Sequence, residues 1–366
     1  MKIAHVVSTF PPRVGGMGQV CMEEVKRLAE AGHDVTVFTT RYTESTLDPQ
    51  WKFKVVYLNS FLKTAAGAFV PQLFFLLHHF DIVHLHYPFY GGAEFVWLAK
   101  IFNKQKYIVT YHMDAQVYGP MKLLQMALDT LWSRLILSDA VKVIAVDKDH
   151  FTTTKFGKFV HPDKLVEIYN GADVEVFKPT VTRSSDAKTI LFVGNLLPLK
   201  RFDLIIQALV KINNDNLSVT VVGGGYDINK YKKIAKDFGV ADKIQFVGYC
   251  NDKEKLSEYY ASTQCLVVPS DCEESFSLVT VEALACGCPV VVSDIPGVCG
   301  RIRDGETGFI FKSGSVEDLA EKIKKILLMS SEDRHSMKEK CRTEALEKYD
   351  WKIHCDKLIE VYKNFN

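Results

Sequence analysis

The chain has 366 residues, of which 47% are hydrophobic and 24% charged. This length is too great for one hydrophobic core and fits two globular domains of ordinary size. Lysine and arginine number 45 and aspartate and glutamate 44, so the formal net charge is +1. That balance argues against a general nucleic-acid binder, which would show a strongly basic surface.

Cysteine usage and the apolar segments indicate an intracellular protein. The nine cysteines form no CxxC pair, and an odd number in a large chain favours reduced thiols over a disulfide framework or a zinc module. The first apolar run stops at Ser8, which is too short for a signal peptide. The segment 64–77 contains Pro71 and falls short of the roughly 20 apolar residues that cross a bilayer. We therefore expect a cytoplasmic protein.

In the first half of the chain, short apolar runs alternate with segments of helical periodicity. The runs show no polar alternation, as expected of strands buried on both faces of a parallel sheet. After the first run, Val20, Val25 and Leu28 recur on one helical face, and Gly32 stands where a helix C-cap belongs. The predicted strands are residues 2–8, 34–40, 53–58, 81–86, 107–112, 141–146 and 165–170.

Residues 179–188 (PTVTRSSDAK) break this rhythm and are predicted to be a linker. The rhythm then restarts, with predicted strands at residues 189–194, 217–223, 243–248, 265–270, 289–294 and 308–313. We predict an α/β fold with two Rossmann-like domains, 1–178 and 188–348, and a final helix in 349–366. Two such domains would place a ligand cleft between the carboxyl ends of their sheets.

The strongest motif is EESFSLVTVEALACGCPVVVSD, in which Glu274 and Glu282 are eight residues apart. The segment predicts a loop, a helix start and a buried strand. A helix N-terminus exposes unpaired N–H groups that suit a phosphate, and a loop carboxylate can accept hydrogen bonds from sugar hydroxyls. The alternative is that both glutamates only complement the helix dipole.

The chain resembles the retaining nucleotide-sugar glycosyltransferases of family 4. The resemblance rests on these residues, on GNLLPLKR and on the GGMG loop after the first strand. The resemblance covers essentially the whole chain and includes the segments DIVHLH, VTYH, VIAVDKDH, VTVVGGG and IQFVG. It implies the GT-B fold, in which two Rossmann-like domains face each other across a cleft. It also implies that the second domain binds the nucleotide sugar, the first holds the acceptor, and the final helix crosses back onto the first.

The resemblance also implies roles for single residues. Glu282 would bind the donor ribose, Glu274 would face the hydroxyls of the transferred sugar, and Lys200 would neutralise the diphosphate leaving group. A lysine suits that place because negative charge builds on the diphosphate as it departs. The remaining donor contacts would come from the backbone at Leu278 and Val279 and from Val247 and Gly248 beside the nucleobase. Gly15 and Gly16 follow the first predicted strand and precede a helix, where glycine either allows close backbone approach to a phosphate or sugar or only forms a tight turn.

Two departures from the family pattern concern the diphosphate. The family usually has arginine where this chain has Asn195, and Arg201, next to Lys200, could supply the missing cation. Ser275 and Ser277 replace the glycines that are common in the loop before the helix, and serine resists a positive φ.

In the first half, His112 ends a predicted strand, and the family has a histidine here near the donor sugar. His84 and His86 point to one face of another strand, but no third ligand is indicated at a sensible spacing, so we predict no metal. Asp147 opens a D-x-D sequence, for which helix capping is the better account.

The apolar stretch 61–80 leaves two readings. Phe69, Leu73, Leu76 and Leu77 give one apolar helical face, most often a core face. In the family, this region can instead touch a membrane near the acceptor, which would place the protein at the inner face of a membrane.

We therefore expect a retaining, metal-independent glycosyltransferase with no cofactor. It would transfer a sugar from a UDP- or GDP-sugar to a glycan or lipid-linked acceptor. Two alternatives remain open. One is a sugar phosphorylase of the same fold, and the other is a donor-binding inactive paralogue.

Overall fold

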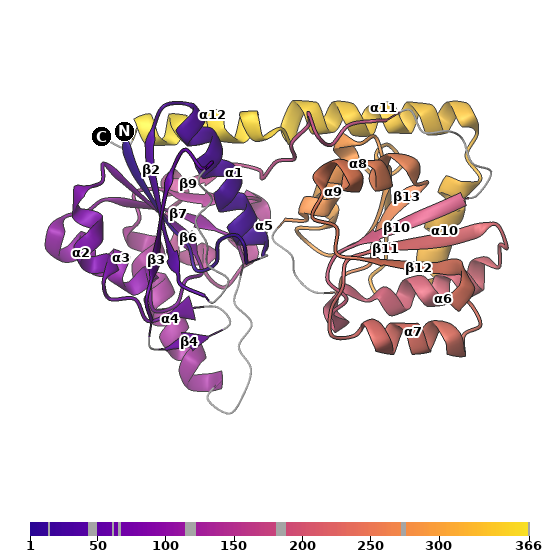
Figure 1. Cartoon of the computed structure of the whole chain (residues 1–366), viewed down its shortest axis with the longest axis horizontal. Helices are drawn as coiled ribbons and strands as arrows, with labels where there is room; N and C mark the ends of the chain where they lie inside the picture. The colour runs from indigo at the N-terminus through magenta and orange to yellow at the C-terminus, as the bar shows by residue number, and fades with distance from the viewer. Residues whose placement is uncertain are drawn as a thin grey trace. The chain divides into compact units, whose positions relative to one another are not determined.

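The computed structural model describes residues 1–13, 15–42, 50–60, 62–64, 67–113, 122–180, 188–271 and 276–364. The chain folds into two compact units, Met1–Asn170 with Trp351–Asn366, and Gly171–Asp350 (Figure 1). Each unit is a parallel sheet covered by helices on both faces, as predicted.

The first unit is built on a seven-stranded sheet in the order β3-β2-β1-β6-β7-β8-β9, with every neighbouring pair parallel. Its strands are β1 (Lys2–Val6), β2 (Asp34–Thr40), β3 (Lys54–Leu58), β6 (Ile82–Tyr87), β7 (Tyr107–Tyr111), β8 (Val143–Ala145) and β9 (Leu165–Glu167). The order reverses between β1 and β6, the position at which doubly wound sheets bind ligands.

Alternate residues of these strands form two cores, because successive side chains point to opposite faces. One core contains Ile3, Ile82 and Ile108 and is covered by α1 and α12, whose Leu28 and Leu358 it includes. The other contains Val6, Val83 and Val109 and is covered by α3 and α4. The helices are α1 (Gly16–Glu30), α3 (Ala93–Asn103), α4 (Lys122–Asp139), α5 (Lys148–Thr153) and α12 (Trp351–Lys363).

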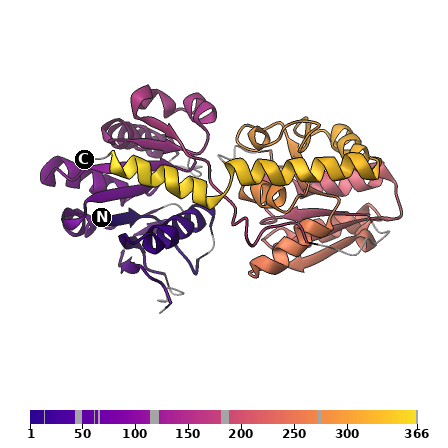
Figure 2. The same cartoon turned by 90° about the horizontal axis from the view of Figure 1, so that it is seen from above.

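Helix α12 belongs to the first unit although it is the last element of the chain. It lies beside α1 in both views (Figures 1 and 2). Trp351, Leu358 and Tyr362 recur on its buried face, as its periodicity predicts. Gly32 adopts a φ of 86° directly after α1 and ends that helix as predicted.

The stretch 61–80 does not form the single apolar helix face that was predicted. Within its described part, β4 (Lys63–Thr64) pairs with β5 (Gly67–Ala68), and α2 (Leu73–Leu76) is only four residues long. Leu73 and Leu77 are buried, whereas Phe69 and Leu76 are exposed. A helix this short cannot present all four side chains to one core, because 3.6 residues complete a turn.

The second unit contains a six-stranded parallel sheet in the order β12-β11-β10-β13-β14-β15. Its strands are β10 (Lys188–Val193), β11 (Leu217–Val222), β12 (Ile244–Gly248), β13 (Cys265–Val268), β14 (Val290–Ser293) and β15 (Gly308–Phe311). This order is the classic one of dinucleotide-binding folds, and it reverses between β10 and β13.

Its main core joins one face of the sheet to α6, α7 and α10, while α8 and α9 contact β10, β13 and β14 and α11 packs on α9. The helices are α6 (Phe202–Ile212), α7 (Ile228–Asp237), α8 (Lys253–Ser262), α9 (Leu278–Ala285), α10 (Val316–Leu327) and α11 (Ser331–Lys348). Single 3₁₀ turns complete the connections at Leu77–His79, Gly157–Phe159, Pro162–Lys164, Pro198–Lys200, Ala241–Lys243 and Cys299–Arg301.

The units divide after Asn170 rather than at the predicted residue 178. The reason is that the intervening segment is bonded to the second unit. The Ala172 N–H donates to the Tyr349 carbonyl at 2.7 Å, and the Arg342 guanidinium donates to the carbonyls of Phe177 and Val174 at 2.8 and 3.1 Å. Of the predicted linker 179–188, residues 181–187 lie outside the described residues.

All thirteen predicted strands are present, seven in one sheet and six in the other. The eight cysteines in the described ranges are free thiols. None of the helices in those ranges combines the length and hydrophobicity of a bilayer-spanning segment.

Candidate functional site

The predicted donor residues gather where the second sheet reverses its strand order. Asn195 and Lys200 follow β10, Ser277 and Glu282 follow β13, and Gly248 ends β12. In a parallel sheet, the carboxyl ends of all strands lie along one edge. The fold therefore brings together motifs that are about 80 residues apart in the sequence.

Backbone hydrogen bonds join the loops at this edge. The Gly194 N–H donates to Val222 at 3.0 Å, the Leu196 N–H to Gly224 at 2.7 Å, and the Gly223 N–H to Gly248 at 2.8 Å. Gly223 has a φ of 132°, and a β-carbon there would collide with the Gly194 carbonyl oxygen. Only glycine permits this close approach, which fixes the loop that carries Asn195.

Asn195 is exposed, and a tyrosine orients its side chain. The Tyr249 hydroxyl donates a hydrogen bond to the Asn195 Oδ1 at 3.0 Å. This contact uses the amide oxygen and leaves the NH₂ group as a donor for a ligand. Asparagine can therefore contribute a neutral hydrogen bond where the family pattern has a charged one.

Arg201 is poorly placed to supply the positive charge that is missing at position 195. Its guanidinium donates to both carboxylate oxygens of Asp203, at 3.0–3.3 Å, and to Asp271 at 2.9 Å. The hydrogen bond to Asp203 is the largest cause that raises the pKa of Arg201 above its ordinary value. Two carboxylates offset its positive charge, so the neighbouring Lys200, which is partly buried, is the better candidate for a diphosphate.

The start of α9 is arranged to receive an anion. Ser277 is the N-cap, yet its side chain makes no capping hydrogen bond, and the first turn contains no acidic residue. The Ser277 hydroxyl is buried and has no hydrogen-bond partner. The N–H groups of Leu278 and Val279 lie in this first turn, where the helix dipole adds partial positive charge.

Glu282 lies within α9, and a buried tyrosine holds it. The Tyr260 hydroxyl donates to the Glu282 Oε2 at 2.9 Å, and Tyr260 is fully buried. This bond fixes the carboxylate, whose oxygens are acceptors that suit a ribose hydroxyl. Glu274 and Ser275, the other predicted residues of this motif, lie outside the described residues.

Val247 and Gly248, predicted to border the nucleobase, are the last residues of β12 and are partly buried. Gly248 has a φ of 85°, and its carbonyl accepts the Gly223 N–H. Both residues therefore lie at the same edge of the sheet as Asn195.

In the first unit, Gly15 and Gly16 begin α1 without a side-chain cap. A β-carbon at Gly16 would meet nothing within 4 Å, whereas one at Gly18 would lie 2.7 Å from the Thr9 carbonyl oxygen. Packing therefore accounts for the glycine at position 18 but not at 16, which is exposed. The open helix start at Gly16 remains suited to a close ligand approach.

His112 follows β7 and is almost buried, with 8% of its surface exposed. Its backbone N–H donates to the Tyr87 carbonyl at 2.9 Å, and its Nε2 lies 2.9 Å from the His86 Nδ1. Burial lowers the pKa of His112 to about 3. The ring is therefore neutral at pH 7 and can take part in hydrogen bonds without carrying charge.

Asp147 caps α5, as predicted, because its side chain accepts the His150 N–H at 2.8 Å. The D-x-D sequence is therefore explained by helix capping.

Sequence reasoning missed a group of polar residues buried beside His84 and His86. His5 of β1, Glu24 of α1 and His354 of α12 are each at most 3% exposed and lie in the same cluster. The sequence pointed to His5 in one way only. Alternate residues of a strand share a face, so His5 lies on the same face as Ile3 and Val7, which are in the core under α1.

Two family models match the chain. "Glycosyltransferase Family 4" matches residues 14–176, and "Glycosyl transferases group 1" matches residues 173–344. Together they span most of the first unit and nearly all of the second.

The chain is also similar to characterised proteins along nearly its full length. It is 26% identical to N-acetyl-alpha-D-glucosaminyl L-malate synthase of Bacillus anthracis, over 99% of this chain and 96% of that protein. It is 25% identical to D-inositol 3-phosphate glycosyltransferase of Corynebacterium aurimucosum, over 95% and 90%.

Solved structures share the fold. A glycosyltransferase from Rickettsia africae aligns with a TM-score of 0.83 at 20% identity, over 100% of this chain and 98% of that one. The Anabaena HepE protein in complex with UDP aligns with a TM-score of 0.82 at 17% identity, over 100% of both chains. With two parallel α/β units and matches to both family models, this chain belongs to glycosyltransferase family 4 and is a transferase with the GT-B fold.

Proposed function

We propose that this chain is a retaining glycosyltransferase that moves a sugar from a nucleotide-diphosphate sugar, UDP- or GDP-linked, to a hydroxyl acceptor. The observation that carries the proposal is the start of α9, which the Ser277 side chain does not cap, at the switch point of the second sheet. The N–H groups of its first turn, with Lys200 following β10 and Glu282 one turn further into α9, match a diphosphate joined to a ribose.

In this proposal, the second unit stabilises the leaving group without a metal ion. The negative charge that develops on the diphosphate is stabilised by the Lys200 ammonium and by the N–H groups of Leu278 and Val279. Asn195 adds a neutral hydrogen bond, and Glu282 fixes the ribose. Because these donors are part of the folded chain, they need little reorganisation as the bond breaks.

The proposed chemistry is a front-face substitution. The bond between the anomeric carbon and the phosphate oxygen breaks, and the acceptor oxygen bonds to that carbon on the same face. The acceptor proton passes to the departing phosphate oxygen, which serves as the base. His112 and Glu274 would position the sugar through its hydroxyls, and the neutral ring of His112 suits a hydrogen bond to an uncharged partner.

Proteins of similar fold support the donor class. The Anabaena HepE protein was crystallised with UDP and with UDP-glucose, and the relatives named above are, by their names, a glucosaminyl malate synthase and an inositol phosphate glycosyltransferase. We infer a nucleotide-sugar donor for this chain from that pattern and from its own α9 geometry.

Calorimetric titration with UDP, GDP and ADP, with and without magnesium, tests the donor assignment. We expect one nucleotide to bind without metal and to raise the unfolding midpoint. If sugar 1-phosphates bind and no nucleotide does, the chain is a phosphorylase of the same fold. If a nucleotide binds and its sugar conjugates undergo neither transfer nor hydrolysis, the chain is an inactive paralogue.

An exposed apolar surface of the first unit supports a lipid-linked acceptor. Large hydrophobic side chains of α2, α3 and their flanks are exposed, and Asn103 joins α3 to α2 by donating to the Phe74 carbonyl at 3.2 Å. Lys104 and Lys106 are exposed directly after α3. The apolar residues are Leu62, Phe69, Phe75, Leu76, Ile101 and Phe102.

We therefore include peripheral contact with an anionic membrane in the proposal. The apolar patch can insert among the lipid chains, and the adjacent lysines can bind the anionic headgroups. Co-sedimentation with phosphatidylglycerol vesicles tests it. Phe75→Ser with Phe102→Ser should reduce the bound fraction, while the exposed Phe238→Ser in the second unit should not. Equal binding of the vesicles by the wild type, the double variant and Phe238→Ser would contradict this contact.

A further inference from the structure

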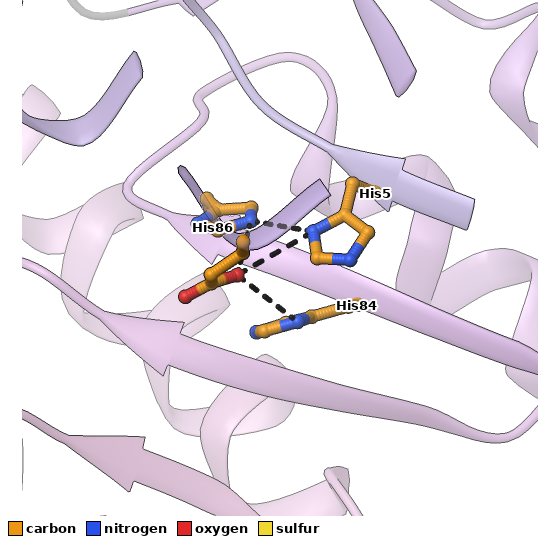
Figure 3. A group of neighbouring side chains, drawn as sticks. His5, His84 and His86 are labelled. Atoms are coloured by element: carbon orange, nitrogen blue, oxygen red, sulfur yellow. Dashed lines mark hydrogen bonds and ion pairs between the residues drawn. The ribbon is translucent and has the colours of Figure 1, made fainter. Parts of the chain in front are cut away.

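Four buried side chains from three elements converge inside the first unit. His5 comes from β1, His84 and His86 from β6, and Glu24 from α1. His5 pairs in register with His84, and Figure 3 shows these two rings and that of His86 close together. All four residues are 0% exposed. They lie on the sheet face that α1 and α12 cover.

The distances between their inward atoms fit a four-coordinate metal ion. Ligand atoms about 2.0–2.1 Å from zinc and tetrahedrally arranged lie about 3.4 Å apart. Here the Glu24 Oε2 lies 3.6 Å from His5 Nδ1, 3.7 Å from His84 Nδ1 and 3.5 Å from His86 Nε2. His5 Nδ1 and His86 Nε2 are 2.9 Å apart (Figure 3). The ligand atoms of the four residues all lie within 4.8 Å of one another, so small shifts suffice for them to surround one ion.

The Glu24 Oε2 is the second, independent observation. It is a buried carboxylate oxygen that accepts no hydrogen bond, although the side chain is 1% exposed. A buried carboxylate oxygen without a hydrogen-bond partner is costly, and such atoms are normally paired or bound to a metal. This oxygen points into the group of three imidazole nitrogens.

Each of the four side chains also has a buried partner on its outer atom. The His86 Nδ1 lies 2.9 Å from the His112 Nε2, and the His84 Nε2 lies 2.6 Å from the Thr110 Oγ1. The His5 Nε2 lies 3.3 Å from the Tyr362 hydroxyl, and the Glu24 Oε1 lies 3.0 Å from the His354 Nε2. Metal ligands typically have such outer hydrogen bonds, which fix the tautomer and the ring orientation.

We propose that His5, His84, His86 and Glu24 bind one divalent transition-metal ion, with zinc the best match to three imidazoles and a carboxylate. Imidazole nitrogen suits zinc, copper, iron and nickel, whereas magnesium and calcium prefer oxygen ligands. All four protein ligands are present and the site is closed to solvent, so the ion is structural. The contact between His86 and His112 links it to the proposed sugar site.

Binding requires a small rearrangement of hydrogen bonds. The proton between His5 Nδ1 and His86 Nε2 moves to the outer nitrogen of the ring that carries it, because both inward nitrogens then bond to the ion. The Tyr362 hydroxyl, now 2.7 Å from the His84 Nδ1, gives up that bond and keeps its contact with His5. The ion would thus join β1, β6 and α1 directly, and α12 through His354 and Tyr362.

Metal analysis of the full chain tests the site. After expression with added zinc and gel filtration in a chelator, we expect one bound ion per chain by plasma mass spectrometry. His5→Gln and Glu24→Gln should lose it, and the surface variant His335→Gln, whose side chain is 76% exposed, should keep it. Thr110→Val should keep the fold and weaken zinc affinity by about 10- to 100-fold.

Cobalt substitution keeps the test decisive if the ligand variants do not fold. The wild-type chain refolded with Co²⁺ should show the intense visible absorption of a tetrahedral ion, and its midpoint should rise with either metal. A wild-type chain that contains no metal after expression and refolding with zinc, and whose midpoint zinc does not move, would overturn the proposal.

Discussion

At the scale of single residues, the proposed donor site differs from its family pattern mainly in charge. Asn195 provides a neutral amide. Arg201, next to Lys200, donates hydrogen bonds to the carboxylates of Asp203 and Asp271. We therefore assign the cationic contact with the diphosphate to Lys200, and this assignment makes the charge at position 195 testable.

Asn195→Arg should tighten binding of the nucleoside diphosphate by about 1–2 kcal/mol, the scale of a charge-assisted hydrogen bond. This gain corresponds to roughly a 5- to 30-fold lower Kd and should shrink as salt is added. Asn229→Arg, at an exposed position of α7, controls for net charge and should leave Kd unchanged. An unchanged Kd for Asn195→Arg would count against our account of this position.

Glu282→Gln keeps the shape of the side chain, and the Tyr260 hydroxyl can still donate to its amide oxygen. The variant loses the charged acceptor for the ribose, so we expect nucleotide affinity to fall by about 1.5–3 kcal/mol with little change in stability. Titration with the nucleotide and with its free base should separate the contribution of the ribose to affinity from that of the nucleobase. Only the nucleotide should bind more weakly, and an equal loss for the base would place Glu282 elsewhere.

At the scale of elements, the start of α9 is the feature on which the proposed chemistry depends. Leu278 occupies the first position of the helix, and Ser277 before it has an extended backbone, with φ −93° and ψ 97°. Proline is tolerated at the first helical position and favours an extended residue before it. One N–H group can therefore be removed without breaking the helix.

Leu278→Pro should weaken binding of the diphosphate by about 1.5–3 kcal/mol, because it deletes one N–H donor to a charged oxygen. Leu278→Ala removes the same side chain and keeps the N–H, so it should bind nearly as the wild type does. The comparison requires calorimetric Kd values and a matching circular dichroism spectrum. If the two variants bind equally, the backbone at this position does not contact the diphosphate.

The strands could be predicted from the sequence because burial on both faces leaves continuous apolar runs. The run 34–40 coincides with β2, whereas the run 165–170 overshoots, since β9 ends at Glu167. The motif from which we propose a donor site could also be identified, because Glu282 and Ser277 lie in one short segment. Glu24 was not, because its partner His354 is 330 residues away, and periodicity alone places a glutamate on the solvent face.

At the scale of the whole molecule, the chain's last helix completes the first unit. Leu358 and Tyr362 are fully buried in the core beneath α1 and α12. The first unit therefore needs both ends of the chain, while the second is continuous from Gly171 to Asp350. We expect the stability of the two units to respond to different perturbations.

Leu358→Ala should destabilise the first unit by about 2–5 kcal/mol, the usual cost of removing a buried leucine side chain. In scanning calorimetry, the unfolding of the first unit should move to lower temperature, while nucleotide should raise the unfolding temperature of the second. Lys357→Ala, at an exposed position of the same helix, should change neither. A nucleotide effect confined to the first unit would contradict the assignment of the donor site.

The most direct test of the account is proton NMR of the full chain with a panel of nucleotide sugars in a metal-free buffer. Slow hydrolysis or transfer to an added glycoside should release the nucleoside diphosphate. Because the proposed substitution takes place on one face, the first-formed sugar product should have the same anomeric configuration as the donor. Release of a product with the inverted configuration, or turnover of sugar 1-phosphates alone, would contradict the proposal.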